Sequence, residues 1–370
     1  MTSRPTRLVA ASLVLLLAAA IPSASARTAA PQQSPDRRHR HGHQAHRGKV
    51  VWDSTSFYAN TAQVAAHGRV PGGRSKVKLQ VKLPGGWHTF ATTRSFRSGR
   101  FAISGSLDWY GSHKVRVSTS GRHRFQRSTT ASALIAYAPR GNPADHVFLM
   151  QRGIRYSFDP CRTVRYVVNA DDVGPAGIAF AQIAMAQASA ATGIPVHYAG
   201  TSHQIPFQTA KTRLPAGQDL LISFADETEI PDFVTRSALG LGGPLWARPA
   251  LDGTRHRVWE TTEAGVVFDT TRWFSGSYDW SFQSTRPNWG ETVLHEVGHA
   301  FGLDHSPAVD EIMYWEAGHG VYPDGQFRGL YDAGDLAGLA ADGLGQGCFH
   351  RVGRFREGAP ARIAGPQPLP

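Results

Sequence analysis

The most constraining stretch of the chain is residues 291–305, ETVLHEVGHAFGLDH, which contains the pattern H-E-x-x-H-x-x-G-x-x-H. In a helix, residues four apart lie on one face, so His295 and His299 can point two imidazoles at one cation. Gly302 allows the helix to end in a positive-φ conformation, and the turn then returns His305 as a third ligand. Three imidazoles leave one open position, which is the ligand arrangement of a catalytic zinc site.

Glu296 follows the first histidine and is not needed as a ligand. A carboxylate at this place can act as general base toward a water on the metal. The flanking sequence favours a helix, because Asn288 followed three residues later by Glu291 fits a capping box. Apolar residues recur at helical spacing through the same stretch, namely Val293, Leu294, Val297, Ala300 and Phe301.

A methionine lies eight residues after the third histidine, in Glu311-Ile312-Met313-Tyr314. Alone, Met313 would be interpreted as an ordinary core residue. Together with the histidine pattern it resembles the metzincin superfamily, and within it the matrixins, which keep a methionine turn beneath the metal. Ser306 directly after His305, and residues 330–339 as the start of a C-terminal helix, support the closer resemblance. The resemblance spans roughly residues 150–348 and is most specific over 291–314.

The resemblance implies a fold, a cofactor and a reaction. The fold is an α/β (α+β) metzincin-like catalytic domain with a twisted sheet and a helix that carries the zinc ligands. The cofactor is one catalytic Zn²⁺, and the reaction is hydrolysis of peptide bonds within a protein chain, with Glu296 as general base. By the same resemblance, the strand before the zinc helix is a sheet edge, and substrate pairs with Gly265, Val266 and Val267. The alternative is a core strand without substrate contact.

Local patterns predict the other elements of this domain. Residues 161–169 are expected to form its first strand, followed by a helix over 175–192 between Pro175 and Gly193. Residues 196–198, 220–224 and 264–269 are predicted strands, and residues 225–262 are interpreted as a Gly/Pro-rich loop. Calcium could bind four acidic residues of that loop, but their spacing fits no known ligand loop, and a solvated acidic loop is the alternative: Asp226, Glu227, Glu229 and Asp232.

Residues 1–26 have the composition of a secretory signal peptide. Arg4 and Arg7 precede an apolar run, Leu8–Ala20, and Ala24-Ser25-Ala26 fits a cleavage site. The apolar run is too short for a membrane anchor. We therefore expect a secreted, extracellular protein without a membrane span.

Charge divides the remainder of the chain into two halves. Residues 27–139 carry 19 Lys/Arg and 3 Asp/Glu, whereas residues 140–370 carry 18 and 25. We expect a disordered His/Arg-rich linker over 27–49, an all-β sandwich over 50–138, the zinc peptidase domain over 140–350 and a disordered tail over 351–370. Alternating apolar and polar residues predict strands in the sandwich, which resembles exported Ig-like modules.

The solvent face of the sandwich is expected to be basic and to carry Lys76, Lys78, Lys82, Lys114 and Arg116. One hypothesis is that this face holds the protein near an anionic surface polymer. The alternative is that the charges only keep the module soluble. Nucleic acid is not expected as a partner of an exported protein, and a monomer is expected.

The chain has two cysteines, Cys161 and Cys348, which bracket the metal motif. In an exported protein they are expected to form a disulfide, with two free thiols as the alternative. Residues 139–145, PRGNPAD, mark the joint between the domains and look like the inhibitory pro-segment motif of matrixins. That motif depends on a cysteine, which is absent here, so a cysteine switch cannot operate.

The sequence thus predicts a secreted zinc endopeptidase. Two other functions stay open at this point. One is an exported surface-binding protein with a non-catalytic zinc domain, although such a protein has no use for Glu296. The other is a zinc hydrolase that acts on another kind of bond.

Overall fold

The structure is a computed structural model that describes residues 48–53, 56–58, 63–71, 73–107, 109–119, 129–134, 138–209, 212–273, 278–352 and 367–369. Of the two units into which the chain divides, all described residues belong to the second, His46–Pro370. The expected signal peptide and nearly all of the expected linker lie outside the described residues. Within the described part, no helix has the length and apolar character needed to cross a bilayer.

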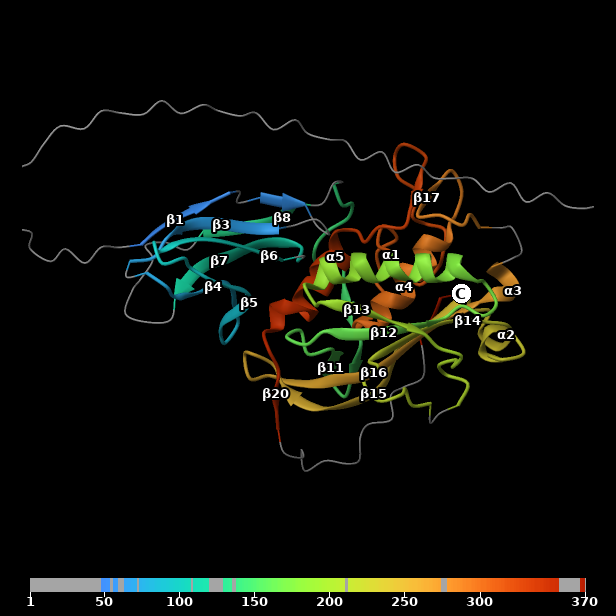
Figure 1. Cartoon of the computed structure of the whole chain (residues 1–370). Helices are drawn as coiled ribbons and strands as arrows, with labels where there is room; N and C mark the ends of the chain where they lie inside the picture. Colours follow the sequence, from blue (N-terminus) through green and yellow to red (C-terminus); the bar gives the residue numbers. More distant parts are fainter. Residues whose placement is uncertain are drawn as a thin grey trace, which may run out of the picture. The chain divides into compact units, whose positions relative to one another are not determined.

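The N-terminal part of the second unit forms two sheets (Figure 1). One has the order β1 (Lys49–Trp52), β3 (Gln63–Arg69), β6 (Arg100–Ser106). The other has the order β2 (Ser56–Tyr58), β8 (Thr129–Leu134), β7 (Gly111–Thr119), β4 (Lys76–Leu83), β5 (Gly86–Arg94). Apolar side chains from β3 and β6 join those from β4 and β7 in one buried cluster, so the sheets pack face to face.

The predicted alternation appears in this sandwich. In β4, Val77, Leu79 and Leu83 are buried, whereas Lys76 and Lys82 are exposed. The Arg116 guanidinium from β7 lies 4.1 Å from the centroid of the Trp87 ring, and Lys82 approaches the same ring at 5.9 Å. Part of the expected basic face is therefore assembled around one tryptophan.

The main sheet follows in the order β13 (Val196–Thr201), β12 (Val164–Asn169), β14 (Leu220–Ala225), β16 (Arg257–Asp269), β15 (Gly240–Leu251). The first four strands are parallel to one another, and β15 is antiparallel to β16. The short β11 (Ile154–Ser157) also pairs with β16. The remaining short strands are β9 (Val147–Phe148), β10 (Met150–Gln151), β17 (Gln283–Ser284), β18 (Leu303–Asp304), β19 (Phe327–Arg328), β20 (His350–Arg351) and β21 (Gln367–Leu369).

Three helices line one face of the main sheet: α1 (Pro175–Thr192), α4 (Trp289–Ala300) and α5 (Ala333–Asp342). Their apolar residues share a buried cluster with Tyr166, Ile222 and Val266 of the sheet. The intervening Val167 and Leu221 point to the opposite face and join a separate cluster. This sheet is therefore buried on both faces, as parallel sheets usually are. The other helices are α2 (Asp232–Arg236), α3 (Thr270–Trp273) and the 3-10 turn η1 (Leu344–Gln346).

Two predictions about this region are wrong. Residues 225–262 are not a loop throughout, because they contain α2, β15 and the first half of β16. Nor is the strand around Gly265, Val266 and Val267 an edge, since it is paired with β14 on one side and β15 on the other. The edge is β15. The prolines of β15 argue against a strand when the sequence is considered alone. Proline is nevertheless tolerated in an outer strand, because an outward-facing N–H is not needed there.

Cys161 and Cys348 form a disulfide in the structure, with their Cα atoms 5.1 Å apart and a sequence separation of 187. The bond joins the segment before β12 to the segment after η1. It therefore closes a covalent loop around nearly all of the main sheet and its helices.

Candidate metal centre

The helix α4 begins where the sequence predicts. Asn288 is its N-cap in extended conformation, and its side-chain oxygen accepts a hydrogen bond from the Glu291 backbone N–H at 3.2 Å. The helix ends at Ala300, and Gly302 follows with φ of +105°. A Cβ at Gly302 would stand 2.1 Å from an Asp342 oxygen and 2.5 Å from the Tyr156 carbonyl oxygen. Backbone conformation and space both require glycine at this turn.

The three histidines of the motif converge. The ring centroids of His295, His299 and His305 are 4.6, 4.8 and 5.1 Å apart in pairs. Each offers a ring nitrogen, and the three nitrogens lie within 4.8 Å of one another. His295 and His299 are fully buried, whereas His305 is half-buried. The cluster can therefore hold one metal ion, and His305 is its most exposed member.

Backbone carbonyl groups set the tautomers of the first two histidines. His295 Nδ1 lies 2.7 Å from the Ile312 carbonyl oxygen, and His299 Nδ1 lies 2.8 Å from that of Leu303. Because a carbonyl oxygen can only accept, both Nδ1 atoms carry the proton and donate it. The buried Nε2 atoms of these two rings then hold lone pairs, and neither has a hydrogen-bond partner among the described residues. This is the arrangement that metal-ligating histidines need.

Burial also keeps these imidazoles neutral. It lowers the pKa of His299 to about 3, with the nearby His305 adding to the effect. It lowers the pKa of His295 far below its ordinary value, and the other two histidines act in the same direction. A neutral imidazole is the form that binds a metal ion. The residues present therefore fit the zinc ion that the sequence predicts.

Met313 lies beneath this helix. It is buried, and a Cβ on Gly298 would stand 2.3 Å from its sulfur. Gly298 thus gives the thioether room between the turns that carry His295 and His299. The Met313 carbonyl oxygen accepts a hydrogen bond from Ser306 N at 2.7 Å, which connects the turn to the residue after the third histidine.

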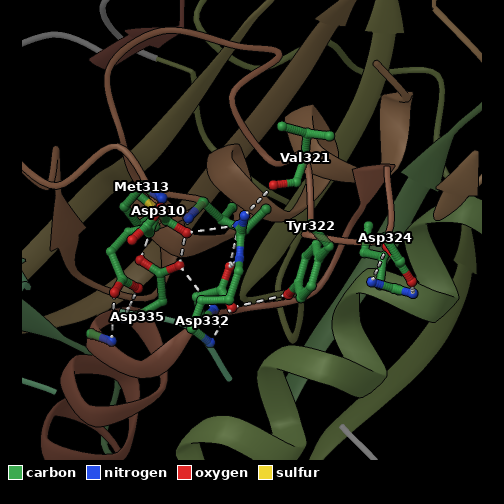
Figure 2. Close-up of polar contacts among 12 residues, drawn as sticks. Asp310, Met313, Val321, Tyr322, Asp324, Asp332 and Asp335 are labelled. Atoms are coloured by element: carbon green, nitrogen blue, oxygen red, sulfur yellow. Dashed lines mark hydrogen bonds and ion pairs between the residues drawn. The ribbon is translucent and has the colours of Figure 1, made fainter. Parts of the chain in front are cut away.

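Carboxylates at the start of α5 hold the methionine turn (Figure 2). Asp335 accepts hydrogen bonds from the Ile312 N–H at 2.7 Å and the Met313 N–H at 3.3 Å. Ile312 in turn accepts from His295 through its carbonyl oxygen. One chain of contacts therefore runs from α5 through the turn to a ligand ring on α4.

Arg140 ties the segment before the main sheet to the same place. Its guanidinium forms an ion pair of 2.7 Å with Asp332 and donates to the Val321 and Asp310 carbonyl oxygens at 2.7 and 2.9 Å. Tyr322 donates its hydroxyl to Asp332 at 2.9 Å, and Arg140 stacks on that ring at 3.9 Å. The predicted domain joint is thus bonded to the segments around the methionine turn and α5 rather than acting only as a linker.

Glu296 is fully buried and lies against the edge strand β15. A Cβ on Gly240 would stand 2.7 Å from Glu296 Cγ and 3.0 Å from its Oε1. A Cβ on Gly242 would stand 2.2 Å from the Glu296 carbonyl oxygen. The two glycines therefore let the edge strand approach the helix at the proposed base.

The outer side of this edge is occupied in the structure by the chain itself. β21 pairs antiparallel with β15, with Gly240 opposite Leu369, Leu241 opposite Pro368 and Gly242 opposite Gln367. The occupied stretch of β15 is the one that packs against Glu296. An extended peptide can therefore pair beside the histidine cluster, and here residues 367–369 do so.

The described residues contain one other group of three potential metal ligands, His88 with Cys161 and Cys348. Both sulfurs are bound in the disulfide and cannot act as thiolates. The acidic residues considered for calcium do not form such a group in the described structure. Asp226 instead accepts hydrogen bonds from Thr228 and Glu229 within its own turn, and Asp232 pairs with Arg236.

A comparison with protein families agrees with this geometry. Residues 249–324 match the family model for matrixin. The match begins near the end of β15 and includes β16, the helix α4, all three histidines, Glu296 and Met313. It supports a matrixin-like metallopeptidase, and matrixins are zinc-dependent. A search of curated proteins found no match to the chain.

The sequence interpretation missed the residues that support the centre from a distance. These are Asp335, Gly240, Gly242 and the carbonyl groups of Leu303 and Ile312. Only the glycines left a signal in the sequence, because Gly and Pro in an extended stretch indicate an edge or a close backbone approach. The matrixin match does not reach Asp335.

Proposed function

We propose that the chain is a secreted zinc-dependent endopeptidase in which His295, His299 and His305 hold the metal and Glu296 is the general base. The observation that carries the proposal is the convergence of three imidazoles, two of them with protonated Nδ1 atoms bonded to carbonyls. The partial matrixin match supports the same reaction class. Secretion rests on the signal-like sequence of residues 1–26 alone.

When bound, zinc supplies Lewis-acid chemistry, which acidifies a coordinated water and polarises the substrate carbonyl. The residues of the chain contribute proton transfer and positioning. The Glu296 carboxylate receives the proton of the attacking water and returns it to the amine that leaves. Its burial against Gly240 holds it in place beside the histidine cluster.

The edge of β15 supplies the means of aligning the substrate. An extended peptide that pairs with residues 240–242 satisfies its backbone groups along an edge adjoining α4. Substrate recognition through backbone pairing demands an unfolded or extended segment. This requirement fits cleavage within a chain.

The test is cleavage of an unfolded protein by the purified chain, with metal content measured in the same sample before and after chelation. We expect one zinc per chain and cleavage that stops on chelation and returns with zinc. One zinc without any cleavage would instead favour the surface-binding protein. A separate binding assay with an anionic polymer tests the basic face of residues 50–138. Absent or salt-insensitive binding would contradict the hypothesis that this face holds the protein near an anionic surface polymer.

A further inference from the structure

A buried carboxylate lies one helical turn before the first histidine. Glu291 is in the first turn of α4, four residues from His295, so both side chains are on the same helix face. It is 6% exposed. Among the described residues, the Asn288 and Gly320 amides act on its carboxylate, but neither oxygen has a hydrogen-bond partner of ordinary geometry. In the capping box predicted from sequence, the Asn288 side chain makes its bond to the Glu291 N–H, whereas the Asn288 N–H acts on the Glu291 carboxylate without reaching ordinary hydrogen-bond geometry.

Glu291 lines a small cavity of about 20 Å³. Ile312, which holds the His295 ring, borders the same cavity, and residues 316–320 form its outer wall. Gly320 is pressed against the carboxylate, because a Cβ there would stand 1.7 Å from Glu291 Oε1. The cavity thus lies beside the histidine cluster, between α4 and the segment after the methionine turn.

The other carboxylates of the lining are already engaged. Glu311 accepts hydrogen bonds from the backbone N–H groups of Gly334 and Asp335, each at 2.9 Å. Glu316 pairs with His319 at 3.1 Å on the outside of the wall. Among the described lining residues, Glu291 is the acid whose oxygens lack such bonds.

The nearest positive charge does not neutralise Glu291. Arg140 acts on it electrostatically, but its guanidinium is bonded to Asp332, Val321 and Asp310. Burial raises the pKa of Glu291 to about 7, against the smaller effects of the Asn288 and Gly320 amides and of Arg140. A buried carboxylate without a partner is costly, and a cation that reaches it removes much of that cost.

We propose that Glu291 is the specificity-determining residue of the pocket for the side chain that follows the scissile bond, and that this pocket takes lysine or arginine. The proposal rests on the proposed peptidase function. The existing cavity has room for about one water, so entry of a long side chain requires the wall of residues 316–320 to move outward. That wall is exposed or half-buried along its whole length.

The experiment compares peptides that are identical except for the residue after the cleaved bond, which is lysine, arginine, glutamine or leucine. The zinc-loaded wild type and Glu291→Gln are assayed on each, and the cleavage position is confirmed by mass. We expect the wild type to favour the basic peptides at least tenfold in kcat/KM. Glu291→Gln, which keeps the shape and removes the charge, should lose at least tenfold on those peptides and change the leucine peptide less than threefold.

Asp324→Asn is the matched control, because it removes an exposed carboxylate that pairs with Arg328 outside the cavity. It should preserve the preference. A wild type that prefers leucine would overturn the inference, and so would an equal loss on all peptides in Glu291→Gln with normal zinc content and melting temperature. No cleavage of any peptide by zinc-loaded wild type would overturn the peptidase function itself, which distinguishes the two failures.

Discussion

At the scale of single residues, the proposed mechanism assigns metal binding and proton transfer to different side chains. His295 and His299 are fixed by carbonyl groups on their Nδ1 atoms and present Nε2 to one point. Glu296, between them in sequence, packs toward β15. This separation means that the base and the ligands can be tested independently.

Glu296→Ala should keep zinc and lose activity by roughly 10²–10⁴-fold, the usual contribution of a general base. The change removes the proton acceptor and none of the three imidazoles. Metal analysis and peptide cleavage on the same sample check this expectation. Loss of zinc in this variant would show that Glu296 has been assigned the wrong role.

Glu291 provides a prediction about pH. Its pKa is about 7 in the folded chain, above the ordinary glutamate value, so the folded state binds the proton more tightly than the unfolded state. Its contribution to stability is therefore fully present below the unfolded pKa and is lost as pH rises toward 7.

We expect the free energy of unfolding of wild type, relative to Glu291→Gln, to fall by up to about 3 kcal/mol from pH 4.5 to 7. Denaturant unfolding of both proteins under chelation measures it. Chelation removes metal binding, and the titration of His295 and His299 then affects both proteins alike. A difference independent of pH would mean that Glu291 is not buried as described.

At the scale of elements, α5 supports a ligand it does not touch. Asp335 holds the amides of Ile312 and Met313, and the Ile312 carbonyl holds His295. Both α5 and the turn must therefore be in place before the His295 ring is oriented.

Asp335→Ala should weaken zinc binding by about 10–100-fold, the usual effect of removing groups that orient a metal ligand, because Asp335 holds the turn whose carbonyl orients His295. Competition with a zinc-binding dye measures the affinity. Asp324→Asn, which removes a carboxylate outside this network, serves as the comparison and should bind zinc normally. Unchanged affinity in a folded Asp335→Ala protein would contradict the role of α5.

The strand β21 occupies the edge on which the proposed substrate pairs. A chain without residues 361–370 should therefore have a lower KM for extended peptides, because no internal segment competes for β15. Steady-state kinetics of the shortened and full chains test this expectation, with kcat expected to stay within a few fold. An unchanged KM would show that the pairing of residues 367–369 does not obstruct substrate.

At the scale of the whole molecule, the disulfide closes a loop that contains the sheet, the histidine cluster and α5. In the chain-entropy view such a bond destabilises the unfolded state, and more so for a long loop. The two halves of the chain also differ in charge, since residues 27–139 are basic and residues 140–370 are acidic. The basic half can therefore bind an anionic polymer independently of the metal centre, and a binding assay with such a polymer tests this.

Replacing Cys161 and Cys348 together by serine should lower the free energy of unfolding by about 3–5 kcal/mol. Denaturant unfolding of the oxidised wild type and the double variant measures the loss. Reduction of the wild type should reproduce it. Equal stability of all three samples would mean that the bond does not constrain the unfolded chain.

The sequence by itself determined the features that depend on neighbours along the chain. Helix periodicity places His295 and His299 on one face, and Asn288 begins that helix. Gly302 has the expected positive φ, α1 has the predicted bounds Pro175–Thr192, and β4 matches the alternating run at residues 76–83. In each case the spacing of side chains fixes the local conformation.

Only the tertiary structure decided what surrounds the metal centre. Asp335 reaches the methionine turn across 22 residues, and the Ile312 carbonyl reaches His295 across 17. The edge strand β15 is extended because it pairs with β16, despite glycines and prolines that disfavour a strand. Glu291 lines a cavity because residues 316–320 pack over it. These contacts depend on long-range packing, which local periodicity does not encode.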